Sequence, residues 1–316
     1  MKPPATARRR LAVLGHPIAH SRSPAMQNAA LRELGLAPEW SYEAIDVAPE
    51  RFEERVRAMP EEGFVGANVT VPHKPAALAV AEVASPAARE IGAANTLSFR
   101  DGHLVAENTD AEGLLAALAG APAGKRALIL GAGGAARAAV WGLVRAGADV
   151  AIWNRTEEKA AKLARELGAS ATQQADAAGF DLIVNATTVG LDPEASLDSL
   201  PLDAQAIHER QTVVDLAYGP SETELARRAR THGARVVDGL EVLVRQGAAS
   251  LRIWTEAEPP LDVMRRAAHE GGPAEPPPAG AAGARASPAD LALLIPIAAA
   301  AAVPSAQTAA SQNAAE

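Results

Sequence analysis

The chain has 316 residues, 48% of them hydrophobic and 22% charged, and its formal net charge is −8. This balance is typical of a globular protein with enough apolar residues to form the cores of two domains. Lys and Arg are spread along the sequence, which excludes the basic surface patch typical of a nucleic-acid-binding protein. Cysteine is absent, which excludes disulfides, zinc–thiolate sites and thiol catalysis and is typical of a reducing cytoplasm.

Histidines and apolar runs argue against two further kinds of site. The seven histidines form no cluster with metal-ligand spacing, so we expect no metal. The longest apolar run, residues 291–303, is well short of the roughly 20 residues that a membrane-spanning helix needs. We therefore expect a cytoplasmic protein that binds neither membranes nor nucleic acids. The oligomeric state stays open, with a homodimer as one option.

In the first third of the chain, short apolar runs alternate with helix-forming segments. We expect strands at 10–15, 40–47 and 63–71 and helices at 23–34, 49–59 and from residue 76. Ser23 before Pro24 is typical of a helix start with Ser23 as the N-cap. Asp101-Gly102, between strands 95–99 and 103–107, predicts a hairpin with a tight turn.

The second half of the chain has a more regular rhythm. After a helix at 111–118 we expect strands at 126–130, 149–153, 181–185, 212–217 and 235–238, with helices between most of them. This order predicts a doubly wound parallel sheet. Helices at 240–254 and 261–268 are expected to return to the first domain.

The fold class is thus α/β, with two α/β domains and a cleft between them. We expect a substrate-binding domain at 1–112, joined by the helices of 240–270, and a Rossmann-type dinucleotide domain at 113–239. Residues 271–316 consist mainly of Ala, Pro and Gly, which predicts a disordered low-complexity tail.

A glycine loop stands at the centre of this organisation. Gly131, Gly133 and Ala136 form a G-x-G-x-x-A pattern directly after the apolar strand 126–130 and at the head of a helix. The first glycine permits the tight turn, the second lets the backbone approach a pyrophosphate, and Ala136 lets the helix pack on the strand. The helix N-terminus then offers N–H groups to the phosphates. An ordinary glycine-rich turn is the alternative.

The end of the next strand indicates which dinucleotide binds. NAD sites place an acid about 20 residues after the glycines, whereas this chain has Asn154-Arg155-Thr156 there. Arg155 is able to pair with a 2′-phosphate, so we predict NADP. The alternative is a solvated surface arginine followed by Thr156 as a helix N-cap.

Lys74 and Asp110 are the candidates for proton transfer. Lys74 follows the carboxyl end of a strand, where α/β folds place ligands, and an acid such as Asp110 would hold its ammonium in position. The alternative is a surface lysine and a helix N-cap aspartate. Further polar groups lie at the ends of elements: the hydroxyls of Ser21 and Ser23 suit a carboxylate, and three neutral groups suit ligand hydroxyls, namely Thr70, Asn95 and Gln246.

Taken together, these motifs resemble those of the shikimate dehydrogenase family over about residues 10–270. The motifs, in family order, are GHPIAHSRSP (15–24), GANVTVPHK (66–74), GAANTL (92–97), NTD (108–110), GAGGAA (131–136), NRT (154–156) and DGL (238–240) followed by Gln246. The resemblance implies reversible NADPH-dependent reduction of 3-dehydroshikimate to shikimate, in the pathway to aromatic amino acids.

The resemblance also assigns roles to residues. Lys74 would be the acid/base group and Asp110 its partner, both in contact with the substrate. The other implied substrate residues are Ser21, Ser23 and Tyr218 for the carboxylate and Thr70, Asn95 and Gln246 for ring hydroxyls. The implied NADP residues are Gly131, Ala132, Gly133, Gly134 and Ala135 for the pyrophosphate, Asn154, Arg155, Thr156, Glu157, Glu158 and Lys159 for the adenosine phosphate, and Leu216 and Gly239 near the nicotinamide.

Four positions depart from the family pattern. Ala106 and Ala111 stand where Gly is common on either side of the Asn-Thr-Asp motif, and Val242 and Gly247 replace the commoner Met and Ala. None of these changes removes a reacting group. Two other functions stay open: a quinate/shikimate dehydrogenase that uses NAD or NADP, and a non-catalytic sensor of NADP or a pathway metabolite.

Overall fold

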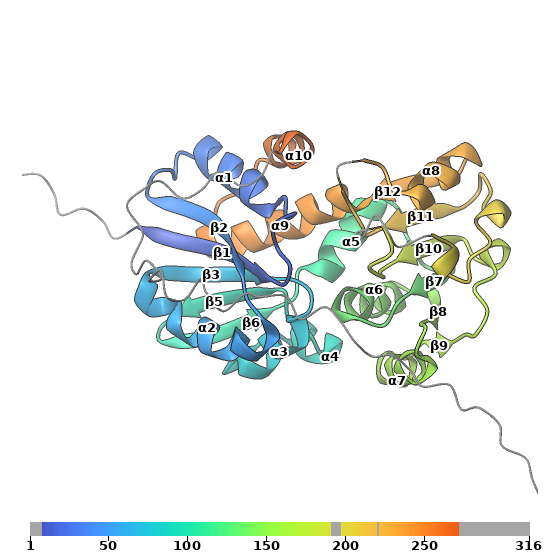
Figure 1. Ribbon diagram of the computed structural model, residues 1–316, viewed down its shortest axis with the longest axis horizontal. Helices are drawn as coiled ribbons and strands as arrows, with labels where there is room; N and C mark the ends of the chain where they lie inside the picture. Colours follow the sequence, from blue (N-terminus) through green and yellow to red (C-terminus); the bar gives the residue numbers. More distant parts are fainter. Residues whose placement is uncertain (1–7, 191–196, 220, 272–316) are drawn as a thin grey trace, which may run out of the picture. The chain divides into compact units, whose positions relative to one another are not determined.

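The structure is a computed structural model that describes residues 8–190, 197–219 and 221–271. Apart from Gly271, the predicted low-complexity tail therefore lies outside the described residues. Two six-stranded sheets organise the described part of the chain (Figure 1).

The first sheet is mixed, with strand order β2-β1-β3-β5-β6-β4. Its parallel strands are β1 (Arg9–Gly15), β2 (Trp40–Asp46) and β3 (Phe64–Val69). The predicted hairpin is confirmed: β5 (Thr96–Arg100) and β6 (His103–Glu107) are antiparallel, and Asp101 and Gly102 both have positive φ, as such a two-residue turn requires. The short β4 (Val83–Ala84) pairs parallel with β6.

Alternate side chains of β1 point to opposite faces of this sheet, and each face is covered by a buried apolar cluster. Leu11 and Val13 pack with side chains of α1 (Ser23–Glu33), α9 (Gly239–Thr255) and α10 (Leu261–Glu270). Ala12 and Leu14 pack in a second cluster with α2 (Phe52–Ala58), α3 (Lys74–Val80) and α4 (Pro86–Ile91). Helices α9 and α10 thus share a buried cluster with one face of the first sheet.

Two local predictions in this region need correction. The helix expected from residue 76 begins at Lys74, and it ends at Val80, because residues 82–85 pair with β6 through Glu82 N–H to Leu104 O and Ser85 N–H to Ala106 O. Helix α4, capped by the Ser85 hydroxyl, follows. The segment expected as one helix at 49–59 is a 3₁₀ turn, η1 (Pro49–Arg51), followed by α2, with a further turn at η2 (Pro60–Glu62).

The prediction of Ser23 as an N-cap is also wrong. Helix α1 begins at Ser23 itself, Arg22 occupies the cap position, and no side chain caps the helix. The Ser23 hydroxyl instead hydrogen-bonds Tyr42 of β2. A tertiary contact has therefore replaced the local one.

The second sheet confirms the predicted doubly wound parallel arrangement. Its order is β12-β11-β10-β7-β8-β9, and all pairs are parallel. Counted along the chain this is the strand order 3-2-1-4-5-6 of dinucleotide-binding sheets. The strands are β7 (Arg126–Leu130), β8 (Asp149–Trp153), β9 (Ser170–Ala171), β10 (Leu182–Asn185), β11 (Thr212–Asp215) and β12 (Arg235–Asp238). The helices are α6 (Gly134–Arg145), α7 (Glu157–Leu167) and α8 (Glu224–Thr231), with short 3₁₀ turns η3 (Ala177–Gly179), η4 (Leu197–Ser199) and η5 (Ala204–Ala206).

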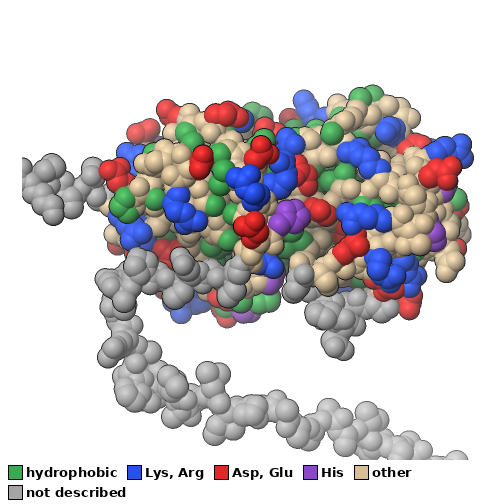
Figure 2. All heavy atoms as spheres, turned by 90° about the horizontal axis from the view of Figure 1, so that it is seen from above, with side chains coloured by type: hydrophobic (Ala, Val, Ile, Leu, Met, Phe, Trp, Pro, Cys, Tyr) green, Lys and Arg blue, Asp and Glu red, His purple; other side chains and the backbone are tan. Residues whose placement is uncertain are grey.

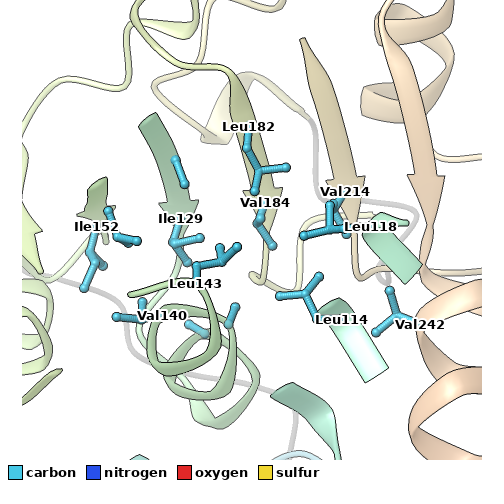
Figure 3. Close-up of a cluster of buried hydrophobic side chains, with 14 of the residues drawn as sticks. Leu114, Leu118, Ile129, Val140, Leu143, Ile152, Leu182, Val184, Val214 and Val242 are labelled. Carbon is cyan, nitrogen blue, oxygen red and sulfur yellow. The ribbon is translucent and has the colours of Figure 1, made fainter. Parts of the chain in front are cut away.

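Helix α5 (Asp110–Leu118) spans the expected domain boundary at 112/113. Leu114 and Leu118 of α5, with Val242 of α9, lie in the same buried cluster as Ile129 and Val184 of the parallel sheet (Figure 3). The amino end of α5, by contrast, follows β6 of the mixed sheet. One helix therefore connects β6 of the first sheet to the core of the second.

The surface carries both signs of charge. On the face that Figure 2 shows, Lys and Arg side chains are intermingled with Asp and Glu. Among the described residues, no helix has the length and apolar character to cross a membrane.

Candidate active site

Lys74 and Asp110 form an ion pair between two element ends. Lys74 is the first residue of α3, after β3, and Asp110 is the first residue of α5, after β6. Lys74 Nζ donates to Asp110 Oδ2 across 2.6 Å, and Lys74 is only 9% exposed. The alternatives of a surface lysine and an N-cap aspartate are therefore wrong: the lysine is buried, and Thr109 occupies the cap position of α5.

Asn95 holds the second oxygen of Asp110. Its Nδ2 donates to Asp110 Oδ1 at 2.9 Å and lies 3.0 Å from Gln246 Oε1, while its Oδ1 accepts from the Thr109 backbone N–H at 2.8 Å. Because that backbone N–H can only donate, the orientation of the amide is determined. Both carboxylate oxygens of Asp110 thus have a donor, which fixes the plane of the carboxylate toward Lys74.

Four hydroxyl-bearing residues gather near the start of α1. Ser21 Oγ accepts from the Ser23 backbone N–H at 3.3 Å, the Ser21 side chain hydrogen-bonds Tyr218, and Ser23 hydrogen-bonds Tyr42. Burial raises the pKa of both tyrosine hydroxyls above their ordinary value, so both stay neutral hydrogen-bonding groups at neutral pH. Uncharged donors of this kind suit a ligand carboxylate. The structure brings Tyr218 from the second half of the chain to Ser21.

Thr70 and Gln246 lie at the margins of this arrangement. Thr70 is half-buried directly after β3, and no side-chain hydrogen bond occupies its hydroxyl in the described part of the chain. Gln246 lies within α9, and its Nε2 donates to the Leu243 carbonyl at 3.0 Å. The roles of Thr70, Asn95 and Gln246 toward ring hydroxyls remain predictions.

The glycine loop has the properties that a dinucleotide phosphate requires. Gly131 has φ +111°, and a Cβ there would lie 2.9 Å from the Ala186 carbonyl oxygen, so only glycine makes this turn without strain. A Cβ on Gly133 would meet no atom within 4 Å, and no side chain caps α6, so the space beside this turn is open and no capping side chain occupies the first N–H groups of the helix. Ala136 is fully buried against the sheet, as expected.

The loop also lies against the lysine. A Cβ on Gly134 would come within 2.9 Å of Lys74 Cβ, so the aliphatic stem of Lys74 packs on the first residue of α6. The half-buried Ala132 and Ala135 flank the same turn. The Lys74–Asp110 pair and the glycine turn at the start of α6 are therefore neighbours.

The segment after β8 is exposed. Arg155, Thr156, Glu157, Glu158 and Lys159 are open to solvent, and Asn154 Nδ2 donates to the Thr156 carbonyl at 2.9 Å. Thr156 occupies the N-cap position of α7, although its side chain makes no cap bond. Within the described residues Arg155 has no carboxylate partner, so its guanidinium is free for an anionic ligand.

The carboxyl end of β11 holds a residue that the sequence did not single out. Asp215 is buried, and burial raises the pKa of its carboxyl group, while Asn185 Nδ2, Thr223 Oγ1 and the Ala217 backbone N–H all donate to it. These bonds order the segment that contains Leu216 and Tyr218. Gly239 lies against the same segment, because a Cβ there would be 2.8–2.9 Å from its carbonyl oxygens.

The four departures from the family pattern are accommodated by packing. Ala106, Ala111 and Val242 are buried in apolar clusters, and the Lys74–Asp110 contact is kept. A Cβ on Gly247 would lie 2.5 Å from Met26 Cε, so Met26 fills the space where the commoner alanine would put its methyl group. In the described part of the chain, no group of three His, Asp or Glu residues is arranged to hold a metal ion.

Family models cover most of this arrangement. The description "Shikimate dehydrogenase substrate binding domain" matches residues 13–97, "Shikimate / quinate 5-dehydrogenase" matches 114–218, and "Shikimate 5'-dehydrogenase C-terminal domain" matches 239–269. Shikimate dehydrogenase (NADP(+)) of Anaeromyxobacter dehalogenans is 48% identical over 276 residues, which cover 82% of this chain and 96% of that protein.

Solved structures agree with this match. Shikimate 5-dehydrogenase of Thermus thermophilus, in complex with NADP(H) and shikimate, is 45% identical, has a TM-score of 0.76, and covers 83% of this chain and 98% of its own. A shikimate 5-dehydrogenase of Listeria monocytogenes in complex with shikimate and NAD is 29% identical with a TM-score of 0.72, covering 82% and 96% of the two chains. The chain therefore belongs to the shikimate dehydrogenase family.

Proposed function

We propose that this protein is an NADP-dependent oxidoreductase that interconverts 3-dehydroshikimate and shikimate. The observation that carries the proposal is the buried Lys74–Asp110 pair, 2.6 Å apart, whose lysine stem packs on Gly134 at the start of the anion-binding helix α6. A proton donor and a dinucleotide phosphate site are thereby adjacent, as reduction of a carbonyl by a nicotinamide requires.

Proton transfer is the part of the reaction that this chain's side chains perform. Bound NADPH supplies the hydride to the carbonyl carbon. Lys74 Nζ donates a proton to the carbonyl oxygen, and in the reverse direction it takes the proton from the hydroxyl group. Asp110, held by Asn95, keeps the Lys74 side chain in position in both directions, whether it carries the proton or has given it up.

Substrate orientation follows from the neutral donors around this pair. Ser21, Ser23 and Tyr218 hold the carboxylate. Their grouping is supported by the Ser23 backbone N–H, which donates to Ser21 Oγ, and by the hydrogen bond between the Ser21 and Tyr218 side chains. Thr70, Asn95 and Gln246 bind ring hydroxyls on the side of Asp110, where Asn95 already contacts Asp110 and Gln246.

Cofactor choice depends on Arg155. The turn at Gly131–Ala135 takes the pyrophosphate, and Arg155, exposed and without a carboxylate partner in the described residues, pairs with the 2′-phosphate of NADP. Asn154 and residues 156–159 surround that phosphate, and Leu216 and Gly239 lie near the nicotinamide.

The remaining proposals concern organisation and cellular context. Residues 1–112 with 240–270 form the substrate-binding part, and residues 113–239 form the NADP-binding part. The protein works in the cytoplasm on small molecules, without nucleic-acid or membrane partners, and a homodimer is the assembly to test first by light scattering.

One rate experiment tests the function. The change in nicotinamide absorbance is followed with purified full-length protein for shikimate and quinate, each with NADP and with NAD. Activity confined to shikimate with NADP supports the proposal. Comparable rates with quinate or NAD would assign the chain to the broader quinate/shikimate dehydrogenases, and no activity in any pairing would favour a non-catalytic sensor.

A further inference from the structure

A cluster of buried polar side chains lies behind the Lys74–Asp110 pair, and Ser250 of α9 joins its members. Ser250 is fully buried, and its hydroxyl lies 2.9 Å from Asn68 Nδ2, 2.8 Å from Thr96 Oγ1 and 3.1 Å from Thr109 Oγ1. It also lies 3.1 Å from the Gln246 carbonyl, one helical turn earlier. A hydroxyl has one proton and two lone pairs, so these neighbours use its whole hydrogen-bonding capacity.

The cluster reaches Asp110 through Asn95. The Thr109 hydroxyl accepts from Asn95 Nδ2 at 2.9 Å, and Asn68 Nδ2 donates to the Asn95 backbone carbonyl at 3.1 Å. Ser250 contacts both Thr109 and Asn68, so it ties together the two groups that hold the side chain and the backbone of Asn95. Asn95 in turn holds Asp110 Oδ1, whose second oxygen accepts from Lys74.

The other end of the cluster reaches the hydroxyl-bearing residues near the start of α1. The Tyr42 hydroxyl donates to Asn68 Oδ1 at 2.7 Å, and Tyr42 also hydrogen-bonds Ser23. Asn68 therefore has its oxygen toward the proposed carboxylate end of the substrate and its nitrogen toward Ser250. A continuous set of hydrogen bonds joins Ser23 to Asp110 beneath the site.

We propose that Ser250 is a positioning residue: by ordering Asn68, Thr109 and Asn95, it sets the orientation of the Asp110 carboxylate that presents Lys74 to the substrate. The inference rests on the proposed function and deepens it. In the described structure Ser250 makes no hydrogen bond to Lys74 or Asp110, so its effect passes through its neighbours.

Ser250→Ala and a matched control test the proposal. The control is Ser98→Ala, because Ser98 is equally buried on β5 but its hydroxyl has no hydrogen-bond partner among the described residues. With shikimate and NADP, we expect Ser250→Ala to lower kcat about tenfold and to change KM less than about twofold. This is the size of effect expected when one hydrogen bond is lost from the set that ends at the Asp110 carboxylate. Ser98→Ala should stay within about twofold of the parent.

A double-mutant cycle tests whether Ser250 acts through Thr109. Thr109→Val removes the hydroxyl between Ser250 and Asn95 while keeping the shape of the side chain. If Ser250 acts through Thr109, the double variant should lose much less activity than the product of the two single losses. Strictly multiplicative losses, or a Ser250→Ala variant with the kcat of Ser98→Ala, would overturn the proposal.

A measurement without turnover separates this inference from the proposed function. Hydrogen exchange of the Asn95 side-chain amide, followed by NMR, should be faster in Ser250→Ala than in the parent and in Ser98→Ala. Unchanged exchange would show that Ser250 does not hold Asn95. A parent protein that oxidises no shikimate would instead contradict the proposed function, whatever the exchange data show.

Discussion

Replacing Asp110 by Asn removes one negative charge and keeps the shape of the side chain. In the structure Asp110 Oδ2 accepts from Lys74 Nζ at 2.6 Å, and Oδ1 accepts from Asn95 Nδ2 at 2.9 Å. An amide has only one oxygen, so its NH₂ group must face either the Lys74 ammonium or the Asn95 amide nitrogen. One of the two contacts then becomes donor against donor.

The size of the effect follows from the contact that is lost. A hydrogen bond to a charged group contributes about 1.5–3 kcal/mol, and about 1.4 kcal/mol corresponds to a factor of ten in rate. We therefore expect Asp110→Asn to lower kcat for shikimate oxidation by about 10- to 100-fold. The hydroxyls of Ser21 and Ser23, which we propose to hold the substrate carboxylate, are untouched, so substrate binding should fall less than kcat.

The assay is the initial rate of NADPH formation at saturating shikimate and NADP. Glu112→Gln is the matched control, since Glu112 is an exposed acid in the same first turn of α5 and the same charge is removed there. Glu112→Gln should keep the parent rate. Asp110→Asn with more than half of the parent kcat, or an equal loss in Glu112→Gln, would refute the role of the ion pair.

Four further predictions follow from particular contacts. Lys74→Ala should abolish turnover while calorimetry still detects shikimate binding; full turnover would contradict proton transfer by Lys74. Arg155→Asp should raise the KM for NADP at least about tenfold more than that for NAD, and an unchanged preference would contradict the 2′-phosphate contact. Gly247→Ala should destabilise the protein in urea, because overpacking against Met26 costs about 1–3 kcal/mol and the helix gains only about 1 kcal/mol; a more stable variant would contradict this. Burial lowers the pKa of His73, so the unfolded chain takes up a proton before the folded protein does as the pH falls below about 6.5, and the stability of the fold should decrease there. His73→Gln should flatten that part of the curve of Tm against pH. An unchanged slope would exclude His73 as the cause.

Much of the fold was predictable because its signals are short-range. The glycine pattern at 131–136 determines a turn that only positive φ permits, and Asp101-Gly102 determines the hairpin turn in the same way. The regular alternation of strands and helices after residue 126 predicted the parallel sheet. The place of Lys74 after a strand and the need of its ammonium for an acidic partner already paired it with Asp110, and the family motifs agreed with this pairing.

Local rules were wrong where a distant partner competes for the same side chain. Ser23 and Asp110 both have the residue type of an N-cap, but Tyr42 engages the first and Lys74 and Asn95 engage the second. The run after residue 76 has the composition of one helix, but pairing with β6 interrupts it. In each case the tertiary interaction replaces the hydrogen bond that local sequence would favour.

The polar cluster beneath the site was the least predictable part. Asn68 and Thr109 lie inside the recognised motifs, but Ser250 does not, and its spacing of four residues from Gln246 on one helix face was the only local signal. Asn68 and Ser250 are 182 residues apart in the chain and 2.9 Å apart in the fold. Local sequence determined the turns, the strands and the glycine loop. The hydrogen-bond partners of the buried polar groups were decided only by the tertiary structure, because packing removed water and left other protein groups as their donors and acceptors.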